Sequence, residues 1–302
     1  MPLLHQEPPA RIDDLDVLLG IAMALEAEAV LRYGQLAVLM EQRGEADTAA
    51  TFRSLMAEEE VHTTAIGRWA SDLGRAAPDG GSFLWLLPPD IAASWDDLVD
   101  RTRLTPYQAL SLAVVNEQRA FAFYSHIAAG TGDDAVRRHA ESLAREELGH
   151  AALLRRERRK AFHRQNGAAA KPARADSPAA LDRLAHSLLG AAAAVHAALS
   201  ERLATDGDAA GAALLAEIAR EEAAVAGDGP AAHPPTDTDT DTNTGATADP
   251  WSAAIAITER LAESFADVAA TATDEAVLGR ALTLQETSIR HLARLASPHH
   301  SS

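Results

Sequence analysis

The chain of 302 residues contains no cysteine. Disulfide bonds, thiol catalysis, zinc ribbons, iron–sulfur clusters and rubredoxin-type iron sites are therefore excluded. Any metal ion that this chain holds has to be bound through nitrogen and oxygen atoms.

Aromatic residues are scarce at 4% of the sequence, whereas apolar residues make up 47% and alanine is abundant. This composition favours helices over sheets. Basic residues are also few: 27 Lys and Arg stand against 44 Asp and Glu, which gives a net charge of −17. A chain this acidic is not expected to bind nucleic acid.

Long hydrophobic runs are missing as well, since no stretch of about 18 uninterrupted apolar residues occurs. Residues 1–14 show neither a basic start nor an apolar run of the kind found in secretion signals. We therefore expect a cytoplasmic protein that has no membrane partner.

What the sequence does contain is strong helical periodicity, interrupted by Pro and Gly. We expect helices over residues 12–43, 46–73, 106–130, 133–164, 179–204, 209–226, 250–271 and 275–296. The first four form two hairpins with short turns, joined by a long connection over residues 74–105. Two hairpins with one long crossover are the connectivity of the ferritin-like four-helix bundle, so the predicted fold class is all-α.

The composition changes after residue 165, which predicts two domains. Residues 12–165 form the four-helix bundle, residues 166–178 a linker, and residues 179–297 an Ala-rich helical domain. Residues 228–249 of the second domain contain an acidic low-complexity tract of Asp and Thr. Such a tract cannot bury a core and is expected to be disordered.

Two helices of the first domain carry a Glu-x-x-His pair on the apolar stripe, where an unpaired charge is costly to bury. These pairs are Glu59 with His62 and Glu147 with His150. A single such pair on an Ala- and Glu-rich helix is usually a solvated surface pair. In the run of three glutamates from Glu58 to Glu60, only Glu59 falls on the stripe, and its neighbours are expected to face solvent.

The other two helices each place one glutamate on the stripe and a tyrosine seven residues later. These residues are Glu26 with Tyr33 and Glu117 with Tyr124. One glutamate from each of two helices, plus Glu-x-x-His from each of the other two, is the ligand set of the di-iron carboxylate bundles. The repeated spacing therefore predicts a metal centre rather than four unrelated surface groups.

Residues 12–164 resemble the ferritin-like superfamily, and within it the rubrerythrin-like branch. The resemblance rests on the segments Glu26-Ala-Glu-Ala-Val-Leu-Arg-Tyr33, Glu58-Glu59-Glu60-Val61-His62, Asn116-Glu117-Gln-Arg-Ala-Phe-Ala-Phe-Tyr124 and Arg145-Glu146-Glu147-Leu148-Gly149-His150. It implies a centre of two Fe ions, with Mn as an alternative metal.

By that resemblance, Glu59 and Glu147 bridge the two metal ions. Glu26 and His62 complete the coordination of one ion, and Glu117 and His150 that of the other. Tyr33 and Tyr124 are expected to donate hydrogen bonds to the carboxylates.

The implied activity is reduction of H₂O₂ or O₂. Rubrerythrins proper have a cysteine-ligated rubredoxin domain, which this chain lacks, so an external electron donor is expected. They also carry a further glutamate ligand near the third-helix glutamate, whereas the helical neighbours of Glu117 are apolar, so six ligands are expected here. Three alternatives stay open: a ferroxidase or iron-handling protein, an oxygenase that acts on an organic substrate, and a non-enzymatic helical scaffold with a vestigial site. Formation of a homodimer is also left open.

The second domain resembles a degenerate copy of the first. His291 follows Val277 at the spacing that separates His150 from its own preceding valine, but Ser288 stands where the first domain has a bridging glutamate. Glu222 aligns with Glu59. This alignment predicts a second ferritin-like bundle that has lost its metal site, although Ala-rich amphipathic helices align easily. His196 has no partner at ligand spacing and is expected to be a surface or packing residue.

Overall fold

The computed structural model describes residues 11–81, 104–166, 172–227 and 249–296. These residues form eight helices and no strand, which confirms the predicted all-α fold. The chain divides into two compact units, residues 2–165 and 166–302, which we call the first and the second unit.

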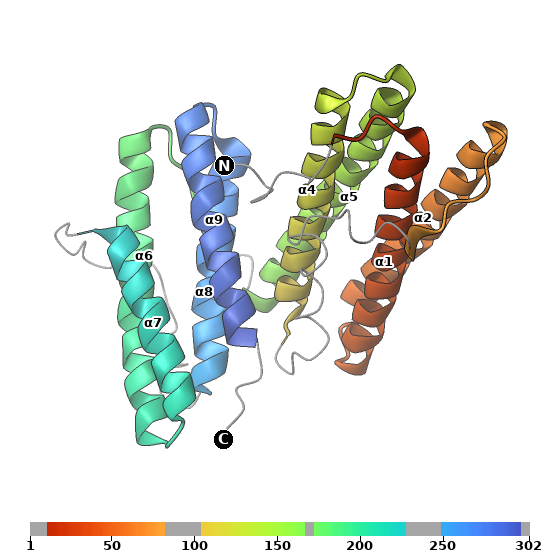
Figure 1. The fold of residues 1–302 in the computed structure, drawn as a ribbon. Coiled ribbons are helices and arrows are strands. Elements are labelled where there is room, and N and C mark those ends of the chain that lie inside the picture. The colour runs from red at the N-terminus through yellow and green to blue at the C-terminus, as the bar shows by residue number, and fades with distance from the viewer. Residues whose placement is uncertain (1–10, 82–103, 167–171, 228–248, 297–302) are drawn as a thin grey trace. The chain divides into compact units, whose positions relative to one another are not determined.

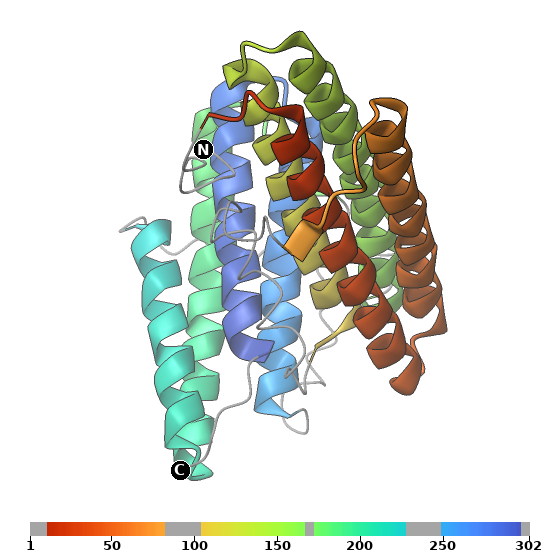
Figure 2. The same cartoon turned by 45° about the vertical axis from the view of Figure 1, so that its right-hand side comes forward.

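The first unit consists of two helical hairpins (Figure 1). The helices are α1 (Leu15–Gln42), α2 (Ala46–Asp72), α4 (Pro106–Gly130) and α5 (Asp134–Asn166). Gly44 lies in the turn between α1 and α2 with a φ of 77°, a value that glycine adopts without strain. In both views of the fold, the two helices of each hairpin lie side by side (Figures 1 and 2). Each predicted helix boundary of this unit is correct to within three residues.

The largest boundary error is at α1, which begins at Leu15 rather than at residue 12. Asp14 caps this helix, since its carboxylate accepts a hydrogen bond from the N–H of Asp16 at 2.8 Å. The carboxylate of Asp13 instead accepts hydrogen bonds from the Thr131 hydroxyl at 2.9 Å and from the Gly132 N–H at 2.8 Å. These bonds tie the chain before α1 to the turn between α4 and α5.

The start of α4 is fixed by a capping motif. Thr105 accepts a hydrogen bond from the N–H of Gln108 at 3.1 Å, and the Gln108 side chain accepts one from the N–H of Thr105 at 2.9 Å. This reciprocal capping box is followed by Pro106 in the first turn, where its missing N–H costs nothing. The cap therefore sets the register of α4, and with it the position of Glu117 three turns later.

A core built from all four helices surrounds the polar stripe residues of the first unit. Leu18 and Ile21 of α1, Ile66 of α2, Phe123 of α4 and Leu143 of α5 are each at most 1% exposed. Burying one such side chain contributes about 1.5–3 kcal/mol. This packing holds the four helices close enough for their polar stripe residues to meet in a dry interior.

The second unit also consists of two hairpins. Its helices are α6 (Pro178–Thr205), α7 (Ala209–Ala226), α8 (Pro250–Thr271) and α9 (Glu275–Ala296). Their predicted bounds are correct to within one residue. Leu181, Phe265 and Leu284 belong to a core contributed by α6, α8 and α9. Gly211 allows α7 to approach α8, because a Cβ at this position would lie 2.6 Å from the ring of Trp251.

A polar cluster centred on Glu222 lies inside the second unit. The Glu222 carboxylate is 2.8 Å from Nδ1 of His196 and 3.5 Å from Nδ1 of His291. These three residues are at most 2% exposed. His196, expected to be a surface or packing residue, is thus a buried hydrogen-bonding residue whose partner comes from another helix.

Several sequence-based predictions lie outside the described residues. They include the large apolar residues of the connection between α2 and α4, such as Phe83, Trp85 and Trp95, and all of the acidic insert 228–249 except residue 249. Within the linker 166–178, residues 167–171 are likewise outside the described part of the chain.

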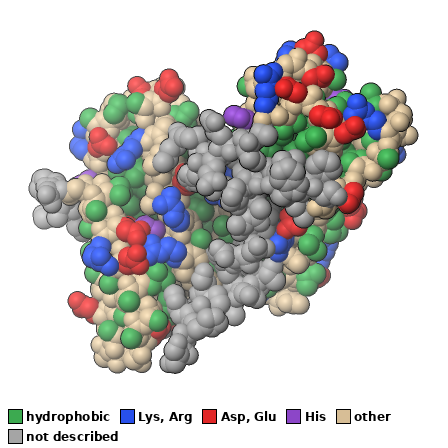
Figure 3. Space-filling model, viewed as in Figure 1, with side chains coloured by type: hydrophobic (Ala, Val, Ile, Leu, Met, Phe, Trp, Pro, Cys, Tyr) green, Lys and Arg blue, Asp and Glu red, His purple; other side chains and the backbone are tan. Residues whose placement is uncertain are grey.

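None of the described helices combines the length and the apolar character that a membrane span needs. On the face shown in Figure 3, the described Lys and Arg side chains lie among Asp and Glu side chains rather than in one continuous basic area.

The cluster around Glu222 makes a prediction about the stability of the second unit. We expect Glu222→Ala to destabilise it by about 3 kcal/mol, because His196 then loses a buried partner. Burial alone would raise the pKa of Glu222, but hydrogen bonds from His196 and His291 bring that pKa below its ordinary value. Glu222 therefore stabilises the fold above the pKa it has in the unfolded chain, and this contribution is lost as the pH falls.

Hydrogen exchange of peptides from α6 to α9 in the full chain measures this effect. The variant should lose protection at pH 7 and show a smaller further loss between pH 7 and pH 4 than the unsubstituted protein. Equal protection of the two proteins at pH 7 would contradict the prediction.

Candidate metal centre

The first unit brings the six predicted ligands together in its interior. They are Glu26 of α1, Glu59 and His62 of α2, Glu117 of α4, and Glu147 and His150 of α5. Five of them are at most 6% exposed, and the His62 side chain is 20% exposed. All four helices therefore contribute to one buried cluster that is open to solvent on its His62 side.

Glu59 lies at the centre of the cluster. Its Oε2 is 3.0 Å from Nδ1 of His62, and its Oε1 is 3.0 Å from Nδ1 of His150. The two imidazole rings stack with centroids 5.2 Å apart and an angle of 16° between their planes. A carboxylate with one oxygen toward each of two histidines is suited to being shared by two metal ions.

The remaining carboxylates lie around the same two nitrogens. Oε2 of Glu26 is 3.7 Å from Nδ1 of His62, and Oε2 of Glu117 is 3.7 Å from Nδ1 of His150. Oε2 of Glu147 is 3.9 Å from that same His150 nitrogen. In two groups of three residues, the ligand atoms lie within 4.8 Å of one another: Glu59 with His62 and His150, and Glu117 with Glu147 and His150.

The donor set fits a metal ion. Nδ1 of His150 is buried and has no hydrogen-bond partner, although three carboxylates surround it. A buried polar atom without a partner is costly, and a divalent cation bound to this nitrogen would remove that cost. Four carboxylates and two imidazoles are hard and borderline ligands that suit Fe(II) or Mn(II).

The glutamates of the cluster have opposite pKa shifts. Burial raises the pKa of Glu26 and of Glu147 well above the ordinary value, and neighbouring carboxylates add to the shift of each. Burial would raise the pKa of Glu59 too, but the close imidazoles of His150 and His62 bring it far below the ordinary value.

The pKa values of both histidines are raised. Hydrogen bonds with Glu26 and Glu59 raise the pKa of His62 to about 10. Burial lowers the pKa of His150, but the nearby carboxylates of Glu117 and Glu59 outweigh it and raise that pKa to about 11. In the metal-free protein, protons on the imidazoles therefore supply the positive charge that the buried carboxylates need.

The two tyrosines differ in their hydrogen bonding. The Tyr33 hydroxyl donates a hydrogen bond to Oε1 of Glu117, and its ring stacks on Phe52 with centroids 5.9 Å apart. The Tyr124 hydroxyl is buried without a hydrogen-bond partner, so the bond expected from it is not formed in this structure. Burial raises the pKa of Tyr124, and the charges of Glu26 and Glu147 raise it further.

Glu58 is a residue that the stripe analysis missed. Its side chain is 46% exposed, which agrees with the expectation that it faces solvent, but its Oε2 also lies 3.6 Å from Nε2 of His150. A repeated pattern contains the missing signal: Ser54-Leu55-x-x-Glu58-Glu59-x-x-His62 recurs as Ser142-Leu143-x-x-Glu146-Glu147-x-x-His150. Helical periodicity alone ignores Glu58, because it lies one residue off the stripe.

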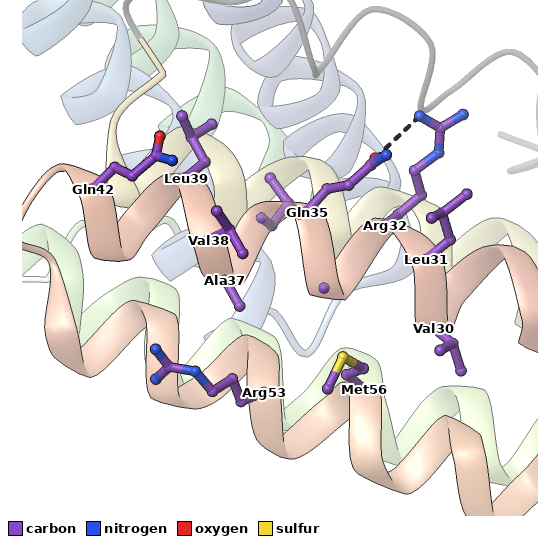
Figure 4. Close-up of a pocket in the computed structure, with 12 residues that line it drawn as sticks. Val30, Leu31, Arg32, Gln35, Ala37, Val38, Leu39, Gln42, Arg53 and Met56 are labelled. Carbon is purple, nitrogen blue, oxygen red and sulfur yellow. Dashed lines mark hydrogen bonds between the residues drawn. The ribbon is translucent and has the colours of Figure 1, made fainter.

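A groove lined by residues of α1 and α2 lies elsewhere in the first unit (Figure 4). It measures about 720 Å³, and its described lining includes Val30, Val38 and Met56. Arg32 donates a hydrogen bond to Gln35 at one side of it. None of the six expected ligands is among the described residues that line this groove, so it is not the metal centre.

Comparison with known proteins agrees with this geometry. A family model described as Rubrerythrin matches residues 18–158, which include all six expected ligands. Residues 18–158 therefore resemble a rubrerythrin domain. No curated protein and no solved structure gives a significant match to the chain. The rubrerythrin match implies a di-iron site, and the buried Glu and His side chains provide groups that can hold the metal.

Substitution of a predicted ligand should change stability and metal binding in opposite directions. Because the raised pKa of Glu147 shows that its ionised form is disfavoured in the fold, Glu147→Gln should leave the melting temperature of the metal-free protein unchanged or raise it. The same variant should lose at least one bound metal ion. Thermal unfolding in a chelator and metal analysis after dialysis check the two effects. A Glu147 whose role is structural would instead show a clear drop in melting temperature.

The tyrosines allow a matched comparison. Tyr33→Phe removes a buried hydrogen bond to a carboxylate and should destabilise the metal-free protein by roughly 1.5–3 kcal/mol. Tyr124→Phe removes a hydroxyl that has no hydrogen-bond partner, so it should not lower stability at all. Urea unfolding of the two variants provides the measurement, and equal losses in both would show that the Tyr33 bond is not stabilising.

Proposed function

We propose that this protein is a di-iron carboxylate oxidoreductase that reduces hydrogen peroxide or O₂ with electrons from an external donor. The observation that carries the proposal is the position of Glu59, whose two oxygens each lie 3.0 Å from a different histidine inside a rubrerythrin-family domain. Single exposed Glu-x-x-His pairs would not produce this arrangement.

The ligands divide between two metal positions. His62 with Glu26 would hold one ion, His150 with Glu117 would hold the other, and Glu59 and Glu147 would be shared. Four carboxylates balance the four positive charges of two divalent ions, so the loaded site is close to neutral. When bound, two Fe(II) ions supply the two electrons that convert H₂O₂ and two protons into two water molecules.

The protein groups around the ligands hold protons and exclude water. The raised pKa of Tyr124 keeps its hydroxyl protonated, and this unpartnered O–H can donate a hydrogen bond to an oxygen atom inside the site. Tyr33 holds the carboxylate of Glu117 in one orientation. The apolar core on the same helices limits solvent access, and the partly exposed His62 marks the side nearest to solvent.

The electron donor follows from what the chain lacks. Without cysteine it has no rubredoxin-type iron or iron–sulfur cluster to deliver electrons, so we propose a separate redox protein as the donor. A reducing cytoplasmic environment suits such a partnership, and we propose that location. If the protein is instead a ferroxidase, it needs no separate electron donor, because a ferroxidase takes its electrons from the Fe(II) that it oxidises.

We also propose that residues 179–297 are a second ferritin-like bundle that has lost its metal ligands. Glu222, His291 and Ser288, which align with residues of the metal centre, are all buried in the second unit. The position three residues after Glu222, which corresponds to His62 in the first unit, is Val225, and this side chain is 39% exposed and cannot bind a metal ion. Among the described residues, groups of three potential ligands close enough to share an ion are found in the first unit alone.

The decisive experiment is an anaerobic Fe(II) titration of the full-length metal-free protein under Mössbauer and optical detection. Two Fe(II) ions per chain should bind, and H₂O₂ should then oxidise both irons much faster than O₂ does. The double variant Glu59→Ala with Glu147→Ala serves as the control and should bind neither ion.

The other outcomes distinguish the alternatives. Rapid oxidation mainly by O₂, with repeated uptake of Fe(II), would replace peroxide reduction with a ferroxidase. Failure to bind two metal ions per chain would overturn the di-iron proposal and leave the helical scaffold as the better description.

A further inference from the structure

Each half of the metal centre carries a second glutamate directly before its ligand glutamate. Residues 54–62 and 142–150 are identical at five of nine positions: the serine, the leucine, both glutamates and the histidine. The ligand glutamate and the ligand histidine account for two of these five positions, and the leucines pack in the core. The serines and the outer glutamates, Glu58 and Glu146, remain to be explained.

The serine holds the outer glutamate in both halves. Ser54 donates a hydrogen bond to Oε1 of Glu58 at 3.3 Å, and Ser142 donates one to Oε1 of Glu146 at 3.4 Å. Serine and glutamate are four residues apart, which places them on the same side of a helix. One oxygen of each outer carboxylate is thus engaged on its own helix, and the other oxygen is left to point away from the serine.

For Glu58 that second oxygen faces the metal centre across the helix pair α2 and α5. Oε2 of Glu58 lies 3.6 Å from Nε2 of His150, which is within ion-pair distance and slightly longer than a hydrogen bond. The His150 side chain is 7% exposed, and that of Glu58 is 46% exposed. Glu58 therefore lies at the boundary between solvent and the buried ligand.

The two nitrogens of His150 have different neighbours. Nδ1 faces the carboxylates of Glu59, Glu117 and Glu147, whereas Nε2 faces Glu58. A neutral imidazole carries its proton on one nitrogen and its lone pair on the other. Histidines that bind metal usually donate the remaining N–H to a carboxylate or carbonyl, and this fixes both the tautomer and the ring orientation.

We propose that Glu58 is a positioning residue for the metal centre: by accepting a hydrogen bond from Nε2–H of His150, it leaves the lone pair on Nδ1 and aims it at the metal. The inference rests on the proposed metal centre and adds a residue to it. The bond needs Oε2 to move closer by only a few tenths of an ångström. Ser54 limits the other positions that the carboxylate can take.

The neighbouring Glu60 provides a matched control. It lies on the same helix two residues further on, is exposed, and has the same charge. If Glu58 acted only by making the surface around the site more negative, removal of either glutamate would weaken cation binding to a similar extent. Orientation of His150 is expected of Glu58 alone.

The test is anaerobic titration of the full-length protein and its variants with Co(II), followed by visible absorption. Glu58→Ala should weaken binding of one of the two Co(II) ions by about 10–100-fold and change its d–d absorption bands. Glu58→Gln keeps an acceptor oxygen and should recover most of the affinity and the unsubstituted spectrum. Glu60→Ala should match the unsubstituted protein in both measurements.

Three results would overturn the proposal. If Glu58→Ala binds both ions with unchanged affinity and spectrum, Glu58 does not position His150, while the metal centre itself stands. If Glu58→Ala and Glu60→Ala lose affinity equally, the effect is one of surface charge. If the unsubstituted protein binds no Co(II), the metal centre and the role of Glu58 are both wrong. Circular dichroism of the metal-free variants checks that each remains helical.

Discussion

Four carboxylates in a dry helical interior can coexist only if positive charge lies among them, and the rest of the first unit depends on this constraint. The histidines provide that charge as protons when no metal is bound, which is why the pKa values of His62 and His150 rise to about 10 and about 11. Divalent ions provide it otherwise and displace those protons. The proposed metal centre would thus exchange these protons for metal ions.

The constraint also explains why the apolar core and the cap of α4 matter to function. Carboxylates that repel one another would separate if the helices could move apart, so the packing of residues such as Phe123 and Leu143 works against that repulsion. The capping box at Thr105 fixes where α4 begins and hence how far along it Glu117 lies. The packing of the apolar core therefore holds the four carboxylates close together, although their mutual repulsion is unfavourable.

Much of this architecture could be predicted from the sequence, and the failures have a common cause. Helix boundaries depend on local signals such as Pro and Gly, so the sequence located them to within three residues. The sequence could predict that the six expected ligands lie close together, because the spacing of stripe residues within one helix determines which face they share. Glu58 and His196 were missed because each has its partner on a different helix, and spacing along one helix cannot reveal such contacts. The missing bond of Tyr124 is likewise a matter of geometry between helices.

The second unit contains a smaller polar cluster, centred on the buried carboxylate of Glu222. Glu222 lies near two imidazoles, as Glu59 does, but Ser288 replaces a glutamate and bonds to the carbonyl of Leu284 in its own helix at 3.0 Å. Glu222 lies 2.8 Å from Nδ1 of His196 and 3.5 Å from Nδ1 of His291, and Nε2 of His291 is also 2.9 Å from the partly exposed carboxylate of Glu221. Both histidines of this cluster therefore have a carboxylate partner within hydrogen-bond distance. On this argument, the number of carboxylates gathered around the histidines, rather than the histidines alone, determines whether a bundle of this kind is suited to bind metal.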